Sequence, residues 1–471
     1  MRRAARLMGV GVLALLLGAG GYAVADAYDI VPGLITLSPP PPTPTPFPTA
    51  PGAVAAPELT GVLANLTGGA AVPAADRVNA LLGALVADSR LGPSVGAVVT
   101  DQRTGAVLAQ HDLDGPHTPA STAKLATAVA ALSSMGTQTT FATRVVRTTA
   151  GQIVLVGGGD MMLAAGKGDP TLVNGRAGLA DLAHQVARGL TLVGTKTVTL
   201  GVDDALFTGP ALNPAWKASD LADGYAAPIS ALAVNIAALS GTGEYPQRQA
   251  DPALAAALQF AAALTAEGIT VTGPPTRVTA PGDAVQLGAV QSAPLGQIID
   301  FFLDRSDNVI TEVVGRLVAL KAGLPGSFDG ATQAVLARDR SLGVDTTGAH
   351  LVDSSGLGSG AVLSAHTLLG LLQAITDPNH PELRQIAAAL PIAGLRGTLS
   401  TRFVDSPASG LVRAKTGSLP GVTALAGTVV DADGRQLLFV IVADKTPGGG
   451  QAAPHAAIDG FVTQLAGCGC G

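Results

Sequence analysis

Residues 118–132 read TPASTAKLATAVAAL, and this stretch decides the fold. After Lys124 almost every position is apolar, which predicts a helix that is buried on all sides. Proline after a threonine cap favours a helix start, so we expect the helix to begin at Thr118-Pro119. Ser121 and Lys124 would then lie on one face of its first turn.

Serine and lysine in this arrangement are the residue types of a nucleophile and its general base. A serine hydroxyl reacts poorly unless a neighbouring group takes its proton. Lys124 can be that base only where burial or a second positive charge lowers its pKa. The N-terminus of a helix also supplies free N–H groups for a developing oxyanion. Ser121 and Lys124 are therefore candidate catalytic residues.

A second polar string, Ser306-Asp307-Asn308, interrupts two apolar helical stretches at 298–303 and 309–321. All three residue types cap helices well, so the string is either an ordinary cap or a loop that projects Ser306 and Asn308 into a cleft. The choice between these readings depends on its partners.

A third string, Lys415-Thr416-Gly417, closes a strand expected at 410–415. A lysine at a strand end can hold an anionic group or act as the second positive charge that Lys124 needs. Glycine at this place allows another backbone to approach closely.

The remaining pattern predicts an α+β fold. Strands at 94–100 and 106–109 lie near the start of the folded chain, and strands at 422–430 and 436–443 lie near its end. We therefore expect one sheet that is assembled from both ends of the folded chain and flanked by helices. Further helices are expected at 78–86, 179–188, 252–267, 329–342, 365–376, 382–389 and 453–465, and further strands at 143–147, 153–156 and 195–200.

The N-terminus predicts export. Arg2, Arg3 and Arg6 precede an uncharged run, Leu7–Ala25, which has the pattern of a signal peptide or a membrane anchor. The following segment, Pro39–Pro51, has eight prolines in thirteen positions. Such a segment favours extended polyproline II and would span roughly 40 Å as a spacer.

Composition excludes other classes of protein. The net charge of −6 and the lack of a basic stripe argue against nucleic-acid binding. The seven histidines form no H-E-x-x-H pair, and Cys468 and Cys470 lack a zinc spacing, so we expect no metal or cofactor.

The three strings together resemble the penicillin-binding proteins and serine β-lactamases. Ser306 lies 185 positions after Ser121, much further than in compact β-lactamases, and this insertion is similar to that of the type-4 class C D-alanyl-D-alanine carboxypeptidases/endopeptidases. Four further stretches share the resemblance: 225–232 (YAAPISAL), 353–357 (DSSGL), 390–394 (LPIAG) and 415–419 (KTGSL).

The resemblance implies a role for each catalytic candidate. Ser121 would be acylated, and Lys124 would be its general base. Ser306 would relay a proton to the leaving amine, and Asn308 would hold Lys124 and the substrate amide. Lys415 would supply a positive field.

The resemblance also implies the substrate contacts. Thr416 and Ser418 would bind the terminal carboxylate beside Gly417, and the N–H groups of Ser121 and Ser418 would form the oxyanion hole. The expected substrate is a peptidoglycan stem peptide, and β-lactam antibiotics would react at the same serine. The residues after Leu357 depart from the family pattern, which leaves the choice of stem peptide open.

On this basis the chain divides into several parts: a signal peptide or anchor (1–25), a proline-rich linker (26–69), a discontinuous catalytic domain (70–147 and 288–467), an inserted mixed domain (148–287) and a tail (468–471). The expected activity is an exported serine D,D-peptidase. A non-catalytic envelope module that binds peptidoglycan or a partner is the alternative, as is a β-lactamase or esterase on the same fold.

Overall fold

The structure of the protein is a computed structural model that describes residues 18–28, 30–31, 37, 69–148, 151–239 and 245–469. The chain divides into two compact units, Met1–Ala64 and Asn65–Gly471. In the first unit residues 18–27 are helical. Among the described residues, no helix has both the length and the apolar character needed to cross a bilayer.

Most of the expected signal or anchor, and most of the proline-rich linker, lie outside the described residues. Both therefore stay predictions.

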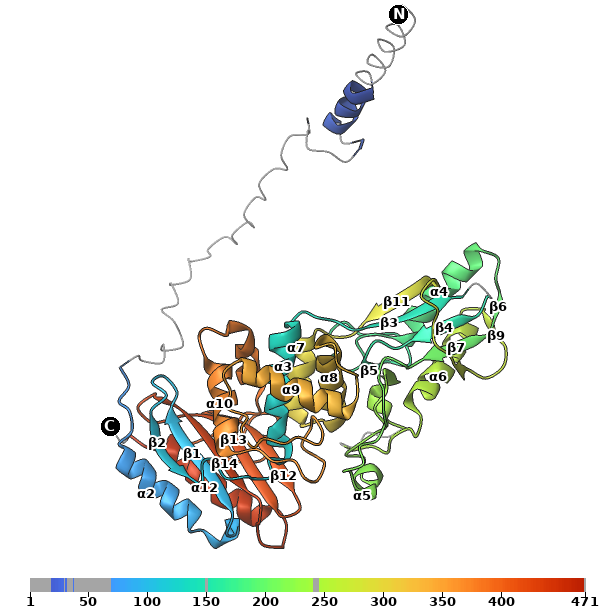
Figure 1. The fold of residues 1–471 in the computed structure, drawn as a ribbon. Helices are drawn as coiled ribbons and strands as arrows, with labels where there is room; N and C mark the ends of the chain where they lie inside the picture. Colours follow the sequence, from blue (N-terminus) through green and yellow to red (C-terminus); the bar gives the residue numbers. More distant parts are fainter. Residues whose placement is uncertain are drawn as a thin grey trace, which may run out of the picture. The chain divides into compact units, whose positions relative to one another are not determined.

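A five-stranded antiparallel sheet forms one half of the second unit, with the strand order β12-β13-β14-β1-β2 (Figure 1). Its strands come from both ends of the folded chain, which confirms the expected assembly; Val98 of β1, for example, lies opposite Val440 of β14. The bounds are β1 Val95–Asp101, β2 Val107–His111, β12 Val412–Leu419, β13 Val422–Val430 and β14 Gln436–Ala443.

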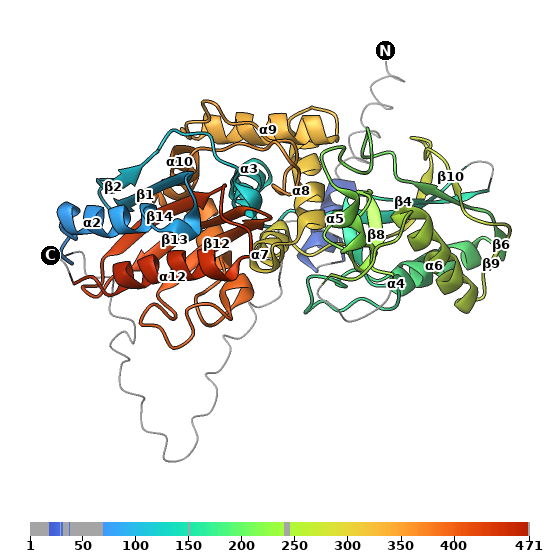
Figure 2. The ribbon, with the colours of Figure 1, turned by 90° about the horizontal axis from the view of Figure 1, so that it is seen from below.

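Helices cover both faces of this sheet because successive side chains of each strand point to opposite faces and both sets are apolar. Val99 and Phe439 face a core that α2 (Ala75–Val86) and α12 (Ala452–Ala466) complete. Val98 and Val440 face the opposite core (Figure 2). The helices on that side are α3 Lys124–Met135, α7 Leu295–Arg305, α8 Asn308–Lys321, α9 Phe328–Ser341, α10 Ala365–Thr376 and α11 Arg384–Ala389.

The helix α3 runs through the middle of this second core. Every residue from Lys124 to Leu132 is buried, as the apolar sequence predicts. A lysine in such a place has lost its water, which makes its hydrogen-bond partners decisive.

A second sheet, β10-β7-β4-β3-β11, is built from the middle of the chain and mixes parallel and antiparallel pairs. Its strands are β3 Ala142–Arg147, β4 Ile153–Val156, β7 Leu200–Asp203, β10 Thr276–Arg277 and β11 Val285–Gln291. The other elements of this part are α4 Leu179–Leu192, α5 Ala218–Ala222, α6 Pro252–Ala266 and the strand pairs β5 Asp160–Leu163 with β8 Leu232–Val234 and β6 Thr197–Val198 with β9 Thr270–Val271.

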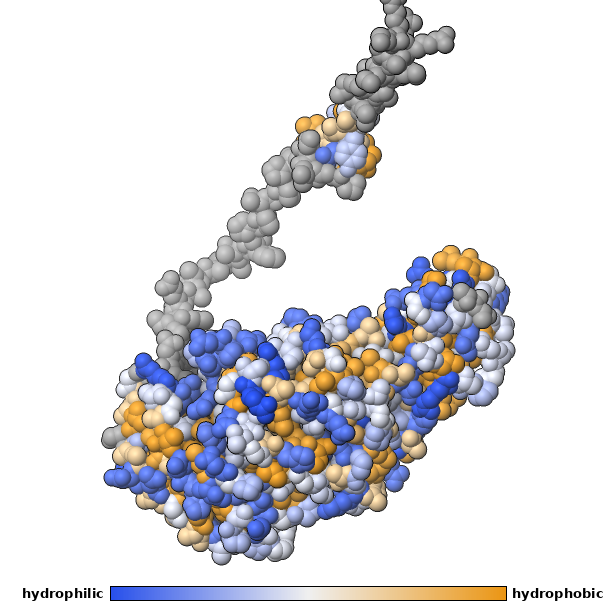
Figure 3. All heavy atoms as spheres, viewed as in Figure 1, coloured by the Kyte–Doolittle hydropathy of each residue, from blue (hydrophilic) through white to orange (hydrophobic). Residues whose placement is uncertain are grey.

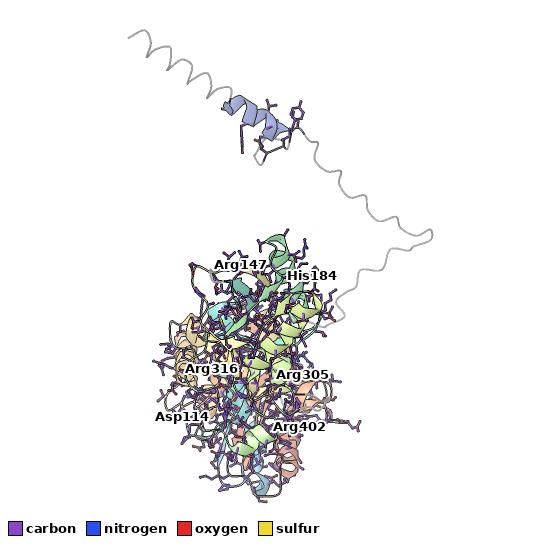
Figure 4. All side chains as sticks on the ribbon, turned by 90° about the vertical axis from the view of Figure 1, so that its right-hand side faces the viewer. Asp114, Arg147, His184, Arg305, Arg316 and Arg402 are labelled. Carbon is purple, nitrogen blue, oxygen red and sulfur yellow. The ribbon has the colours of Figure 1, made fainter. Side chains whose placement is uncertain are left out.

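The expected division at 148–287 stays a prediction. The strands β3 and β11 pair with each other and belong to this second sheet, so the sheet itself extends from Ala142 to Gln291. Arg147 of β3 and His184 of α4 lie at one end of the second unit in Figure 4. At the end of α4, Leu192 is 88% exposed, and Figure 3 shows apolar side chains gathered there.

Candidate active site

Ser121 lies in a short 3-10 turn, Ala120–Ala123, and not in the first turn of an α-helix. The expected helix start at Thr118-Pro119 is wrong, because Ala120 has φ 47° and this left-handed conformation interrupts a helix. The α-helix α3 begins at Lys124. The turn still brings the side chains of Ser121 and Lys124 together.

Lys124 makes three hydrogen bonds through its ammonium group. Nζ donates to Ser121 Oγ at 2.8 Å, to Asn308 Oδ1 at 2.7 Å and to the carbonyl oxygen of Ser355 at 2.9 Å. Burial lowers the pKa of Lys124 to about 8, although three nearby carboxylates, those of Asp353, Glu312 and Asp307, oppose this shift. A share of the side chain is therefore neutral near neutral pH and can accept a proton.

The residues of the second string have different roles: one caps a helix and two belong to the site. Asp307 caps α8, because its carboxylate accepts a hydrogen bond from the backbone N–H of Ile310 at 2.8 Å. Ser306 ends α7 in the left-handed region, with φ 56°. This break directs Ser306 toward Lys415, while Asn308 contacts Lys124. Asp307 is therefore a helix cap, whereas Ser306 and Asn308 project into a cavity.

The third string lies within a strand and does not end it. The strand β12 pairs with β13 through Leu419, so the expected end at 415 is wrong. Lys415 Nζ donates to Ser306 Oγ at 2.9 Å and to the carbonyl oxygen of Thr416 at 2.9 Å. Burial and the positive charge of Lys124 hold the pKa of Lys415 well below its usual range.

Gly417 lies where β12 passes Ala120–Ala123, here called the nucleophile turn. A Cβ at this position would lie 2.8 Å from the carbonyl oxygen of Pro119 and 3.3 Å from the Cβ of Ala120. Since real Cβ atoms do not approach a backbone oxygen so closely, glycine is required for the strand to lie beside the turn.

A cavity of about 940 Å³ opens over these residues. Ser121, Ser306, Asn308, Thr416 and Ser418 line it from the catalytic side. Residues from the middle of the chain line its other wall: Lys217, Ser219, Asp220, Asp223, Tyr225 and Tyr245. The structure thus brings all the predicted catalytic candidates together and adds a wall from the second part of the fold.

Two polar residues that the sequence did not indicate lie beside the third string. Thr398 Oγ1 is 2.8 Å from Thr416 Oγ1. His455 Nε2 is 3.3 Å from Ser418 Oγ, and burial together with the positive charge of Arg402 lowers the pKa of His455 to about 4. His455 is therefore neutral near pH 7.

Two buried carboxylates also escape prediction from the sequence. Glu312 and Asp353 are fully buried. Both accept hydrogen bonds from backbone N–H groups in the turn that carries Ser355. Only tertiary structure places them there, although Asp353 belongs to one of the stretches that carry the family resemblance. Among the described residues, no group of three or more His, Cys, Asp or Glu side chains could hold a metal ion.

The model of the D-Ala-D-Ala carboxypeptidase 3 (S13) family matches residues 78–245 and 235–465. The chain belongs to the S13 family. A carboxypeptidase of Mycobacterium tuberculosis is 39% identical over 409 residues, which are 85% of this chain and 86% of the relative. Carboxypeptidase DacB of Mycolicibacterium smegmatis is 39% identical over 78% of this chain and 79% of the relative.

Solved structures confirm the fold of this S13 protein. The structure of penicillin binding protein 4 (dacB) from Haemophilus influenzae superposes with a TM-score of 0.67 at 22% sequence identity. The match covers 80% of this chain and 97% of that chain. The expected α+β class, with a β-lactamase/D,D-peptidase-like sheet flanked by helices, is therefore confirmed.

Proposed function

We propose that this S13 protein is a serine D,D-peptidase that hydrolyses D-Ala-D-Ala bonds of peptidoglycan stem peptides through an acyl-enzyme on Ser121. One observation carries the proposal. A fully buried lysine, Lys124, holds its Nζ 2.8 Å from the hydroxyl of Ser121, and burial lowers its pKa to about 8. A binding module has no use for a base of this kind.

Acylation begins when Ser121 Oγ attacks the carbonyl carbon of the penultimate D-Ala. Lys124 Nζ takes the hydroxyl proton as the new C–O bond forms. The carbonyl oxygen becomes an oxyanion that accepts hydrogen bonds from the N–H groups of Ser121 and Ser418. Lys415 adds a positive field through Ser306, whose hydroxyl it contacts.

The C–N bond then breaks. Ser306 relays a proton from Lys124 to the leaving nitrogen, so terminal D-Ala departs as a neutral amine and Lys124 is neutral again. Water next attacks the ester on Ser121, with Lys124 as the base, and Ser121 leaves with a proton. The overall reaction consumes one water and needs no cofactor.

The free carboxylate of the substrate fits the hydroxyl groups beside β12. Thr416 lies next to Thr398, and Ser418 is exposed to the cavity. We propose carboxypeptidase activity as the main reaction, because relatives of this chain are named carboxypeptidases. Cleavage of cross-links is the second activity to test, by comparing D-Ala release from uncross-linked pentapeptide with cleavage of a cross-linked dimer.

A penicillin tests the proposal directly. The Haemophilus influenzae protein was also solved in complex with a β-lactam. After incubation with penicillin G, the intact mass should rise by one acyl group, and the peptide that contains Ser121 should carry it. The adduct should disappear in Ser121→Ala. A folded protein without an adduct would contradict the proposal.

The site of action proposed for this enzyme is outside the cytoplasmic membrane. The basic and apolar N-terminal sequence, residues 1–25, would direct export, and the proline-rich linker, 26–69, would separate the catalytic unit from the membrane. We favour an uncleaved anchor over a cleaved signal.

A further inference from the structure

A short stretch from the middle of the chain crosses the turn that carries Ser355. Residues 213–216, here called the strap, lie over residues 353–358, here called the lysine turn. The side-chain amide of Asn213 donates to the carbonyl oxygen just before the lysine turn, at 2.7 Å. The carbonyl oxygen of Ala215 accepts from the first backbone N–H after it, at 3.3 Å. The strap therefore holds both ends of the lysine turn.

Trp216, the last residue of the strap, contacts the side chain of Asp353, the first residue of the lysine turn. Its indole N–H donates to Asp353 Oδ2 at 2.7 Å. Trp216 is the only tryptophan in the chain and is 8% exposed. Its ring packs edge-to-face against Phe328, with 5.3 Å between the ring centroids. A buried carboxylate needs donors, and the indole N–H is one of those that Asp353 has.

The carboxylate of Asp353, which the indole holds in place, in turn fixes the backbone of the lysine turn. Its Oδ1 accepts from the N–H of Gly356 and its Oδ2 from the N–H of Gly358, both at 2.7 Å. The carbonyl of Ser355 and the N–H of Gly356 belong to the same planar peptide group, so the hydrogen bond to Gly356 also fixes this carbonyl. The carbonyl oxygen is one of the acceptors of Lys124 Nζ, at 2.9 Å.

A second anchor holds the same turn from the catalytic side. Glu312, on α8, accepts from the N–H groups of Ser354 and Ser355 at distances between 2.8 and 3.1 Å. The Ser355 carbonyl is thus fixed by α8 on one side and by the strap on the other. The titratable groups that face Lys124 are Asp353, Glu312 and Asp307, which raise its pKa, and Lys415, whose own pKa the charge of Lys124 lowers. Burial and the charge of Asp353 raise the pKa of Glu312 to about 8.

We infer that Trp216 is a positioning residue for acylation, which holds the Ser355 carbonyl against Lys124 through its hydrogen bond to Asp353. The middle part of the chain is therefore a component of the acylation machinery as well as a wall of the cavity. A lysine side chain has four rotatable bonds, so its amine stays 2.8 Å from Ser121 Oγ only while its acceptors are fixed. The inference rests on the proposed role of Lys124 as base.

The experiment removes the indole N–H and follows acylation by a fluorescent penicillin. In Trp216→Phe we expect the second-order rate constant for acylation to fall roughly 10- to 100-fold. The pH below which the acylation rate falls should also move to a lower value. The ammonium of Lys124 would lose an acceptor in this variant, so it would deprotonate more easily. A change in stability alone would not move this pH value.

Two further proteins separate the hydrogen bond from packing. Phe328→Leu disturbs the contact of the indole ring but keeps its N–H, and should acylate with an unchanged pH profile. Since the chain has one tryptophan, a tryptophan analogue with sulfur in place of the N–H can also be incorporated at this position alone. It keeps the ring's size, so it tests the hydrogen bond even where Trp216→Phe fails to fold.

The inference is overturned if the sulfur analogue acylates at the wild-type rate with the same profile, or if Phe328→Leu shows the same loss as Trp216→Phe. Failure of the proposed function has a different result, because the wild-type protein would then form no adduct on Ser121. Circular dichroism on each variant establishes that the compared proteins are folded.

Discussion

At the scale of single residues, the buried amine of Lys124 sets the pH dependence of the reaction. Its pKa is about 8, and only the neutral form accepts the proton of Ser121. We therefore expect the acylation rate constant to rise about tenfold per pH unit below 8 and to level above it. Stopped-flow measurement with a fluorescent penicillin from pH 6 to pH 9.5 checks this.

Lys124→Arg is the matched control. Arginine keeps the positive charge but does not deprotonate in this range, so the folded variant should form no adduct. A rate constant for the wild-type protein that is flat between pH 6 and pH 9 would contradict the assignment of Lys124 as base.

Gly356 provides a second test at this scale. It has φ 75°, and a Cβ there would lie 2.0 Å from the carbonyl oxygen of Ala120. Gly356→Ala should thus displace the nucleophile turn and lower acylation at least roughly 100-fold. Gly343, with φ 87° and no atom within 4 Å of its added Cβ, carries the same backbone strain without the collision. Gly343→Ala should cost stability, measured by urea unfolding, and leave acylation unchanged; equal losses in both would exclude the steric explanation.

At the scale of elements, the short strand β5 carries a carboxyl that links stability to pH. Asp160 is buried there, and burial raises its pKa from 3.8 to about 7. Between these values the folded protein keeps a proton that the unfolded chain has released. The free energy of unfolding therefore falls as pH rises through this window, by up to roughly 4 kcal/mol.

Asp160→Asn should remove most of that decrease, which urea unfolding at pH 5 and pH 7.5 measures. Asp283→Asn, an exposed aspartate of the same part of the chain, should keep the wild-type slope. An unchanged slope in Asp160→Asn would show that other groups carry the pH dependence.

The elements that the sequence predicted well are those in which apolar residues recur with a regular pattern. The helix α3, the hairpin of β13 and β14 and the assembly of the sheet from both chain ends follow from apolar patterns. Two boundaries at the site were wrong, each for a physical reason. Ala120 adopts a left-handed backbone conformation that alanine does not signal, so α3 begins later than expected. The strand β12 continues past Lys415 because it pairs with β13 through Leu419.

The polar residues that hold the site in place could not be predicted from the sequence, for a different reason. Glu312, Asp353 and Trp216 lie far from one another in the sequence, and each alone has an ordinary interpretation in a helix or loop. Their function depends on which backbone N–H groups lie opposite them, and this is a property of the folded chain.

At the scale of the whole molecule, the proposed role of residues 1–25 in export would determine where the enzyme works. If residues 1–25 are an uncleaved anchor, the exported native chain should sediment with membranes. Replacement of these residues by a cleavable signal peptide should release an active enzyme into the soluble extracytoplasmic fraction. Penicillin labelling of both fractions measures this, and a native chain found only in the soluble fraction would identify residues 1–25 as a cleaved signal.

The pairing of β1 with β14 also has a consequence for biosynthesis. The nucleophile turn follows the first two strands, while Lys415 belongs to a strand near the opposite end of the chain. The loop between these parts must close before the sheet exists, and closure of so long a loop is slow. A nascent or prematurely ended chain therefore carries Ser121 without its electrostatic partner. We therefore expect reactivity toward D-Ala-D-Ala to arise only after β12 has joined the sheet, so that hydrolytic competence would report the assembly of the two ends of the folded chain.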